Sequence, residues 1–113
     1  MKKIEAIIRP EKLEPLRMYL EEIGCPGMMV TEIEGHGKQG GVQHQWRGAE
    51  YKTIFLPKIK LEIVVPDSNV KKICAGILEV CRSGAVGDGK IFISPVSDAI
   101  RIRTNEKGDK AIK

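Results

Sequence analysis

At two places in this chain, the spacing of the apolar residues changes from every second residue, as in a strand, to every third or fourth residue, as in a helix. These two changes constrain the fold more than any other feature. Residues 58–65 (KIKLEIVV) alternate between apolar and mostly charged side chains, which predicts a strand with one buried face. Pro66, Asp67 and Ser68 follow and predict a helix start, with Asp67 or Ser68 as the N-cap. Residues 69–82 then carry apolar side chains at helical spacing, namely Val70, Ile73, Cys74, Ile77, Leu78 and Cys81.

The N-terminal part of the chain shows the same strand–helix order. Residues 2–9 alternate and predict a strand, and the leucines within residues 11–23 recur at helical spacing. Pro15 is compatible with that helix only in its first turn, and Gly24 predicts its end. Residues 28–34 alternate again, so we expect a second strand after the helix.

The C-terminal part begins with a glycine-rich turn and a strand at residues 90–96. Residues 100–103 (IRIR) predict a short extended segment with Arg101 and Arg103 on the same side. The polar tail after it is expected to fray. The order of elements is strand, helix, strand, loop, strand, helix, strand. It predicts an α+β, ferredoxin-like βαββαβ sandwich, in which two helices cover one face of a four-stranded antiparallel sheet.

The second face of the predicted sheet mixes charged residues with Ile7 and Val64. We interpret this face as a charge-paired interface between subunits and expect a closed ring of subunits. Assembly would add to the modest core that a chain of 113 residues can bury by itself. The length fits a single domain that spans residues 1–113.

Composition narrows the class of protein further. The net charge of +4 is mild and spread along the chain, so it permits an anionic ligand and does not require nucleic acid. The three cysteines lack CxxC spacing, and Cys74 and Cys81 share one face of the predicted helix. This usage fits a reducing compartment. We expect a cytoplasmic protein without a signal peptide or a membrane span.

The segment from Gly35 to Pro57 is long for a connection between strands. It is rich in glycine and contains both histidines and the only tryptophan, Trp46. A structureless loop of this length is usually functional or disordered. His36 and His44 lack a third partner at metal spacing, so we interpret them as solvated residues rather than ligands. Trp46 is a candidate contact for a partner protein, the alternative being that it packs on its own loop.

Several groups of residues have the chemistry to bind an anion. Residues 87–90 (GDGK) would turn backbone N–H groups toward a polyphosphate, or they form a plain turn before a strand. Arg101 and Arg103 would share an anion, or they charge an edge strand against pairing. Residues 37–41 (GKQGG), with Lys58 at the far end of the same loop, would hold a carboxylate or a phosphate, or they are simply flexible.

The amide oxygen of Gln39 is a suitable ligand for a hard cation such as Mg²⁺. We find no nucleophile, base and acid in an arrangement that suggests catalysis. The chain is therefore expected to bind ligands rather than to be an enzyme.

Several stretches of the chain occur in the same order and spacing in one protein family. They are MKKIEAII at the start, GMMVTEIEGHGKQGG (27–41), RGAEY (47–51), FLPKIKLEIVVPD (55–67), GDGKIFI (87–93) and IRIRT (100–104). Together they closely resemble the PII signal-transduction proteins that regulate nitrogen metabolism. The resemblance implies a homotrimer of ferredoxin-like subunits that binds ATP or ADP in the clefts between subunits and senses 2-oxoglutarate together with Mg-ATP. It also implies a T-loop at about 36–57, a B-loop at about 82–90 and a C-terminal loop at about 101–113.

The resemblance further implies roles for individual residues. For ATP or ADP it implies four groups of contacts. They are the residues around the adenine (Gly27, Met28, Met29 and Val64), the phosphate-binding B-loop (Gly87, Asp88, Gly89 and Lys90), the base of the T-loop (Gly37, Lys38 and Gln39), and Arg101 and Arg103 from a neighbouring subunit. For 2-oxoglutarate it implies Gln39, Gly41 and Lys58. Gln39 would also contact the Mg²⁺ that is bound with ATP.

A few positions depart from the family pattern. Met29 stands where many members have Thr, so it keeps the packing and loses a hydroxyl group. Lys38 stands where Arg is usual, so it keeps the charge and loses the bidentate fork. Tyr51 matches a tyrosine that some bacteria uridylylate, but the KTIF that follows differs from modified members, and its modification stays open. Ala49 replaces a serine that is phosphorylated in other members.

The expected function is that of a nitrogen-regulatory signal-transduction protein. The implied targets are an ammonium transporter, glutamine synthetase or their regulators, contacted through Trp46 and Arg47, with a membrane approached only through a transporter partner. One alternative is a PII-like trimeric nucleotide-binding regulator that responds to a different effector or to nucleotide only. A weak ATPase would need a water-activating base, which is not evident. A nucleic-acid-binding module would need exposed aromatic side chains on the strands.

Overall fold

The computed structural model describes residues 1–36, 43–46, 49–52 and 55–113. Its strands are β1 (Lys2–Ile8), β2 (Met29–Gly35), β3 (Gln43–Trp46), β4 (Ala49–Lys52), β5 (Leu56–Val65) and β6 (Lys90–Pro95). The α-helices are α1 (Leu13–Glu22) and α2 (Val70–Cys81), and short 3-10 helices occupy Pro10–Lys12, Asp67–Asn69 and Gly108–Ile112. No helix in these ranges is long and apolar enough to cross a membrane.

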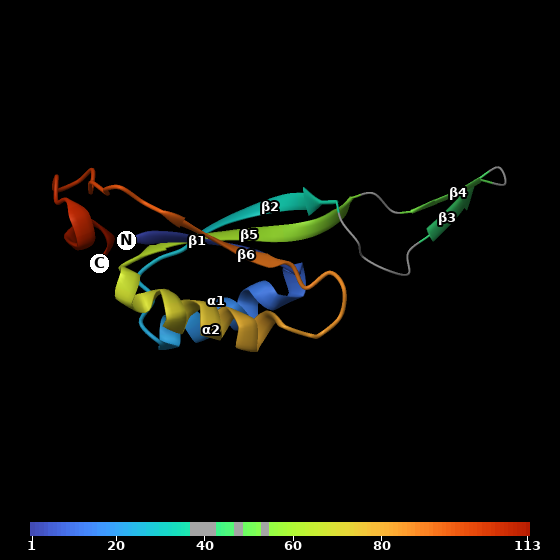
Figure 1. Cartoon of the computed structure of the whole chain (residues 1–113), viewed down its shortest axis with the longest axis horizontal. Helices are drawn as coiled ribbons and strands as arrows, with labels where there is room; N and C mark the ends of the chain where they lie inside the picture. Colours follow the sequence, from blue (N-terminus) through green and yellow to red (C-terminus); the bar gives the residue numbers. More distant parts are fainter. Residues whose placement is uncertain (37–42, 47–48, 53–54) are drawn as a thin grey trace.

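The four-stranded sheet has the order β2–β5–β1–β6, and every neighbouring pair is antiparallel. Strand β1 lies inside the sheet, where Lys2 pairs with Val65 of β5 and with Pro95 of β6. Both α-helices cover the same face of this sheet (Figure 1). The ferredoxin-like βαββαβ prediction is therefore confirmed.

The alternation in the sequence decides which face of the sheet is buried. The core between sheet and helices contains Ile4, Ala6, Ile8, Leu16, Leu20, Ile59, Leu61, Ile63, Val65, Ile73, Ile77 and Cys81. Cys74 packs against this core, so both helix cysteines lie where the periodicity predicts. On the opposite face, the Nζ atoms of Lys3 and Lys60 lie 3.8 Å and 3.6 Å from the carboxylate of Glu62. These charges pair within the chain, and a role of this face between subunits stays a prediction.

The two helices approach each other closely because Gly76 of α2 has no side chain. A Cβ atom on Gly76 would lie 2.5 Å from Cε1 of Tyr19 in α1. The Tyr19 ring fills this space and packs against the core. Glycine in the interior of a helix destabilises that helix by about 1 kcal/mol relative to alanine. The close packing of the Tyr19 ring against Gly76 offsets this lower helix propensity.

The segment 35–57 is not structureless throughout, which corrects the prediction of a plain loop. Strands β3 and β4 form an antiparallel hairpin in which Trp46 pairs with Ala49. Strand β5 begins earlier than predicted, at Leu56, and pairs there with Gly35 at the end of β2. Figure 1 shows the hairpin beyond the ends of β2 and β5. The hairpin strands QHQW and AEYK are mostly polar, and the apolar alternation that reveals a half-buried strand is missing from them.

The C-terminal segment folds back on itself, which corrects two further predictions. Residues 100–103 do not form an extended segment, because the N–H of Arg101 donates to the carbonyl of Glu106 and the N–H of Asn105 to the carbonyl of Arg101, each at 2.8 Å. Asn105 has a φ of 62°, in the left-handed region that turns require. The tail does not fray, because it ends in the 3-10 helix Gly108–Ile112.

The start of α2 also differs from the prediction. Asn69 occupies the N-cap position and makes no capping hydrogen bond with its side chain. The carboxylate of Asp67 instead lies 3.0 Å from the N-terminal ammonium group of Met1. That ion pair lowers the pKa of Asp67, and it removes the carboxylate from the capping role that the sequence pattern suggests.

Candidate functional site

One carboxylate closes the loop between α2 and β6. Oδ2 of Asp88 accepts hydrogen bonds from the backbone N–H groups of Ser83 and Gly84, each at 2.8 Å. Oδ1 accepts a hydrogen bond from the Ser83 hydroxyl at 2.5 Å and another from Nε of Arg9 at 3.3 Å. The bonds from Ser83, followed by those from Gly84 and Arg9, hold the pKa of Asp88 well below its usual range. This side chain is therefore ionised at neutral pH and engaged in shaping the loop.

Two cations bind carbonyl groups of the same loop from neighbouring positions on the sheet. Nη2 of Arg9, directly after β1, donates to the carbonyl oxygen of Val86 at 2.8 Å. Nζ of Lys58, in β5, donates to the carbonyl oxygen of Gly87 at 2.8 Å. Lys58 is only 8% exposed, and its burial, together with the nearby charge of Arg9, lowers the pKa of its ammonium group. Lys58 and the loop that precedes β6 thus form one site.

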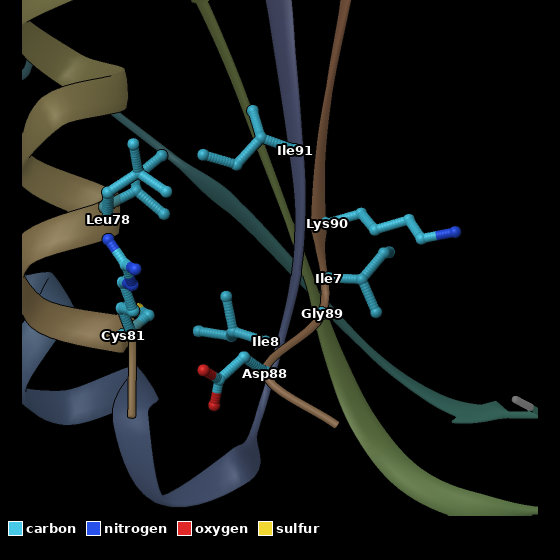
Figure 2. A pocket seen from close by; sticks show the side chains of 10 residues that line it. Ile7, Ile8, Leu78, Cys81, Asp88, Gly89, Lys90 and Ile91 are labelled. Atoms are coloured by element: carbon cyan, nitrogen blue, oxygen red, sulfur yellow. The ribbon is translucent and has the colours of Figure 1, made fainter. Parts of the chain in front are cut away.

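The loop enters β6 through a close approach of two backbones. Gly89 has a φ of +96°, and a Cβ atom there would lie 1.7 Å from the carbonyl oxygen of Ile7. Figure 2 shows Asp88 pointing toward α2 and Lys90 pointing to the opposite face of the sheet. On the helix side lies a cavity of about 250 Å³, lined mainly by apolar side chains of β1, α2 and β6 (Figure 2).

A second cavity lies toward the other end of the sheet. It has a volume of about 410 Å³ and brings together Gly27, Met28, Met29 and Val64, the residues that the resemblance assigns to the adenine surround. Residues 111–113 of the C-terminal tail form part of its wall. The sequence did not indicate this contribution, because the tail was expected to fray.

The length of β6 separates the C-terminal arginines from the loop that precedes the strand. Lys90 pairs with Ile7 at one end of β1, and Pro95 pairs with Lys2 at the other end. The steps from residue 90 to residue 95 span about 16 Å at about 3.3 Å per residue. Arg101 follows still further along, and Figure 1 shows the C-terminal segment at the far end of the sheet. One chain therefore does not place Arg101 and Lys90 on the same phosphate group.

Arg101 is held by its own C-terminal tail. Nη1 lies 3.5 Å from Oε1 of Glu106, and Nη2 donates to the carbonyl oxygen of Lys113 at 2.5 Å. Arg103 is exposed and lies in the turn that follows. The prediction that the two guanidinium groups lie side by side on an extended segment is therefore wrong, because that segment turns.

Comparison with known proteins identifies the family. The family model "Nitrogen regulatory protein P-II" matches residues 1–106. The chain belongs to the P-II family. Nitrogen regulatory protein P-II of Haemophilus influenzae is 52% identical over 112 residues, which cover 99% of this chain and 100% of that protein. Nitrogen regulatory protein P-II 1 of Escherichia coli is 52% identical with the same coverage. Nitrogen regulatory protein P-II 2 of Methanothermobacter thermautotrophicus is 51% identical over 112 residues, which cover 99% of this chain and 97% of that protein.

These relatives confirm the nitrogen-regulatory assignment of the sequence. P-II proteins are regulators that act on partners in nitrogen metabolism, so the expectation of a regulatory protein rather than an enzyme is confirmed by family membership. In keeping with the names that the resemblance implies, we call the loop that precedes β6 (residues 82–90) the B-loop and the segment that contains the β3–β4 hairpin (residues 36–57) the T-loop; these assignments stay predictions.

Part of the T-loop lies outside the residues that the structure describes. The predicted site residues in that part are Gly37, Lys38, Gln39, Gly41 and Arg47, and their roles stay predictions. Trp46 and Tyr51 are described in their backbone, as members of β3 and β4. At the base of the T-loop, the ring of His36 lies 5.7 Å from the ring of Phe55. Over the described ranges, no group of three or more His, Cys, Asp or Glu residues could hold a metal ion.

Arg9 and Ser83 belong to the B-loop site although the sequence did not single them out. Arg9 follows a strand and precedes a proline, which is an ordinary position for a surface arginine. Ser83 lies in the helix-stop sequence Ser83-Gly84. Only the pairing of Ile7 with Lys90 brings the end of β1 beside the B-loop, and that register is not visible in the local pattern.

Proposed function

We propose that this P-II protein is a homotrimeric sensor of ATP or ADP and of 2-oxoglutarate that controls its targets through the T-loop. The observation that carries the proposal is the separation of Arg101 from Lys90 by the length of β6. Both residues are cations that the family resemblance assigns to the phosphates of a nucleotide. A cleft between subunits would join the B-loop of one subunit to the C-terminal loop of the next, and a single chain does not.

Exposed apolar side chains along the edge of the sheet support an assembly. Phe92 and Ile93 of the edge strand β6 are about half exposed, and Ile102 is 100% exposed. A second subunit that packed along this edge would remove these apolar side chains from water. Because β6 connects the B-loop to the C-terminal loop, a subunit that packs along this strand would lie beside both loops.

The nucleotide is proposed to place its base in the cavity at Gly27, Met28, Met29 and Val64 and its phosphates at the B-loop. Val64 pairs with Lys3, and Lys90 pairs with Ile7, so the two groups lie about 13 Å apart along β1. A nucleoside triphosphate is long enough to connect them. Gly37, Lys38 and Gln39 of the T-loop base would close over the nucleotide, and Arg101 and Arg103 would come from the neighbouring subunit.

The 2-oxoglutarate site is proposed at Lys58, with Gln39 and Gly41 as further contacts. Within the described part of the chain, the Lys58 ammonium makes one hydrogen bond, to the carbonyl oxygen of Gly87. Lysine has three donors, so donors remain for a carboxylate. Gln39 would also contact the Mg²⁺ bound with ATP, since an amide oxygen is a suitable ligand for that cation.

The targets are proposed to be an ammonium transporter, glutamine synthetase or their regulators. The resemblance assigns the partner contact to Trp46, the last residue of β3, and to Arg47, which lies outside the described residues. Tyr51 lies in β4 and is the candidate for uridylylation. The protein is proposed to be cytoplasmic, to approach a membrane only through a transporter partner, and not to bind nucleic acid.

Isothermal titration tests the sensor. ATP should bind more tightly in the presence of saturating 2-oxoglutarate and Mg²⁺, and 2-oxoglutarate should bind more tightly in the presence of Mg-ATP by the same factor, because linkage between sites is reciprocal. Light scattering on the same samples should give the mass of three chains. Binding of ATP with no effect of 2-oxoglutarate would instead support a regulator that responds to nucleotide only.

A further inference from the structure

We infer that Arg9 is a positioning residue of the B-loop, which acts with Lys58 to turn the backbone N–H groups of Gly87 and Asp88 toward a bound polyphosphate. The inference rests on the proposed nucleotide binding and adds to it a residue that neither the sequence pattern nor the family resemblance singled out. It follows from the two cation–carbonyl contacts of the loop and from the side on which Asp88 lies.

The orientation follows from the geometry of the peptide group. In a trans peptide the C=O and the next N–H point in opposite directions, and the described residues contain no cis peptide. Arg9 holds the carbonyl of Val86, and Lys58 holds the carbonyl of Gly87. The N–H groups of Gly87 and Asp88 must therefore leave the loop on the side away from these two cations. Among the described residues, neither N–H takes part in another hydrogen bond.

The backbone of the loop supports the same conclusion. Gly87 and Gly89 have φ values of 103° and 96°, so the chain changes hand around Asp88. Successive N–H groups in such a conformation form a concave site for an anion. Arg9 and Lys58 stabilise this conformation, because Arg9 donates a hydrogen bond to the carbonyl of Val86 and Lys58 donates one to the carbonyl of the next residue, Gly87.

The carboxylate of Asp88 would repel a phosphate if it faced the same side. Figure 2 shows it pointing toward α2, while Lys90 points to the opposite face of the sheet. Arg9 and Ser83 hold it there, since Nε of Arg9 lies 3.3 Å from Oδ1 and the Ser83 hydroxyl lies 2.5 Å from the same atom. Asp88 thus contributes its N–H to the anion site, and its charge is neutralised elsewhere.

One guanidinium group makes both contacts of Arg9. Its Nε donates to Asp88, and its Nη2 donates to the carbonyl of Val86. A lysine has a single ammonium group and cannot reproduce this fork. The conservative substitution therefore separates the geometry of the loop from the presence of a positive charge near it.

The test compares Arg9→Gln and Arg9→Lys with the wild-type protein by titration with ATP. We expect Arg9→Gln to weaken ATP binding about tenfold, since hydrogen bonds to charged groups hold the loop, and Arg9→Lys to recover little of this loss. Arg17→Gln is the matched control, because Arg17 forms its ion pairs with Glu14 and Glu21 within α1. Its ATP affinity should equal that of the wild type. Wild-type affinity in Arg9→Gln, or full recovery in Arg9→Lys, would overturn the inference.

Asp88→Asn gives an independent readout. If only electrostatics mattered, removing this negative charge near a phosphate would tighten ATP binding. Asp88 also closes the loop, however, because it accepts hydrogen bonds from Ser83, Gly84 and Arg9. Weakening these hydrogen bonds should therefore weaken ATP binding about tenfold. Weaker binding supports the inference, and tighter or unchanged binding contradicts it.

Titration with inorganic pyrophosphate, followed by amide NMR, separates the inference from the proposed function. The Gly87 and Asp88 N–H resonances should shift in the wild type and not in Arg9→Gln. A wild-type protein that binds no ATP refutes the nucleotide sensor, but these shifts would still support the loop geometry. Their absence in the wild type would refute the geometry even if ATP binds.

Discussion

Replacing Gly76 by alanine tests how closely the two helices pack. The new Cβ would lie 2.5 Å from Cε1 and 3.1 Å from Cδ1 of the Tyr19 ring. Atoms at the shorter distance overlap, so the ring or a helix must move, and overpacking of this kind costs about 1–3 kcal/mol. The higher helix propensity of alanine contributes about 0.8–1.0 kcal/mol in the opposite direction. We therefore expect a net loss of stability of about 0–2 kcal/mol.

The same substitution should change sign when the ring is removed. In Tyr19→Val, the valine side chain ends at its γ carbons and has no atom that corresponds to Cδ1 or Cε1 of the tyrosine ring. In this background Gly76→Ala should stabilise the protein by about 0.8–1.0 kcal/mol, which is the propensity difference alone. The coupling energy between the two substitutions should then equal the overpacking, about 1–3 kcal/mol.

Urea unfolding of the wild type, the two single variants and the double variant measures this coupling. All four proteins are compared at one concentration, because assembly makes apparent stability depend on concentration. The coupling energy is taken from the four free energies of unfolding. If Gly76→Ala stabilises both backgrounds equally, the Tyr19 ring does not lie against Gly76, and the packing described for α1 and α2 is wrong.

Three further predictions concern the B-loop and the C-terminal segment. Gly89→Ala should abolish ATP binding, because its Cβ atom would lie 1.7 Å from the Ile7 carbonyl oxygen. Gly84→Ala is the control, because Gly84 has a φ of +89° and open space around it. This variant should bind ATP, and its free energy of unfolding in urea should fall by only about 1–2 kcal/mol. Equal effects of the two would contradict the close approach. The folded pKa of Asp88 is below its unfolded value of about 3.9, so its stabilisation is complete above about pH 5 and is lost as the pH falls through the folded pKa. The difference in urea midpoint between wild type and Asp88→Asn should therefore shrink from about pH 5 downward, and a constant difference would refute this assignment. Ile102→Asp should lower the mass in light scattering at unchanged circular dichroism, and an unchanged mass would place this exposed residue outside the interface.

The sequence predicts the elements whose side chains alternate between a buried and an exposed environment. β5 is such an element, because the core residues from Ile59 to Val65 recur at every second position. α2 is another, because Ile73, Ile77 and Cys81 share its buried stripe. In both cases the period of the apolar residues is set by the geometry of the element itself, so local sequence is sufficient.

Elements stabilised in other ways escape the same reasoning. The β3–β4 hairpin is mostly polar, and the C-terminal turn depends on Asn105 and on the backbone contacts of Arg101, which join residues that no periodicity relates. The B-loop site depends on the register of β1 with β6. The GDGK sequence at 87–90 indicates an anion site, but Arg9, which binds the Asp88 carboxylate and the carbonyl group of the preceding Val86, lies near the other end of the sequence.

Lys58 illustrates how such a register changes the environment of a side chain. By alternation it belongs to the face of Lys60 and Glu62, which predicts an exposed ammonium group, yet it is 8% exposed. Its stem lies beside Gly35, where a Cβ atom would approach Cγ of Lys58 to 3.0 Å, and its ammonium group binds the carbonyl of Gly87. The absence of a side chain at Gly35 therefore leaves room for the Lys58 stem at the end of β2. Because one lysine contacts both the base of the T-loop and the B-loop, any anion that draws Lys58 away from Gly87 must also change the backbone on which the phosphate site depends.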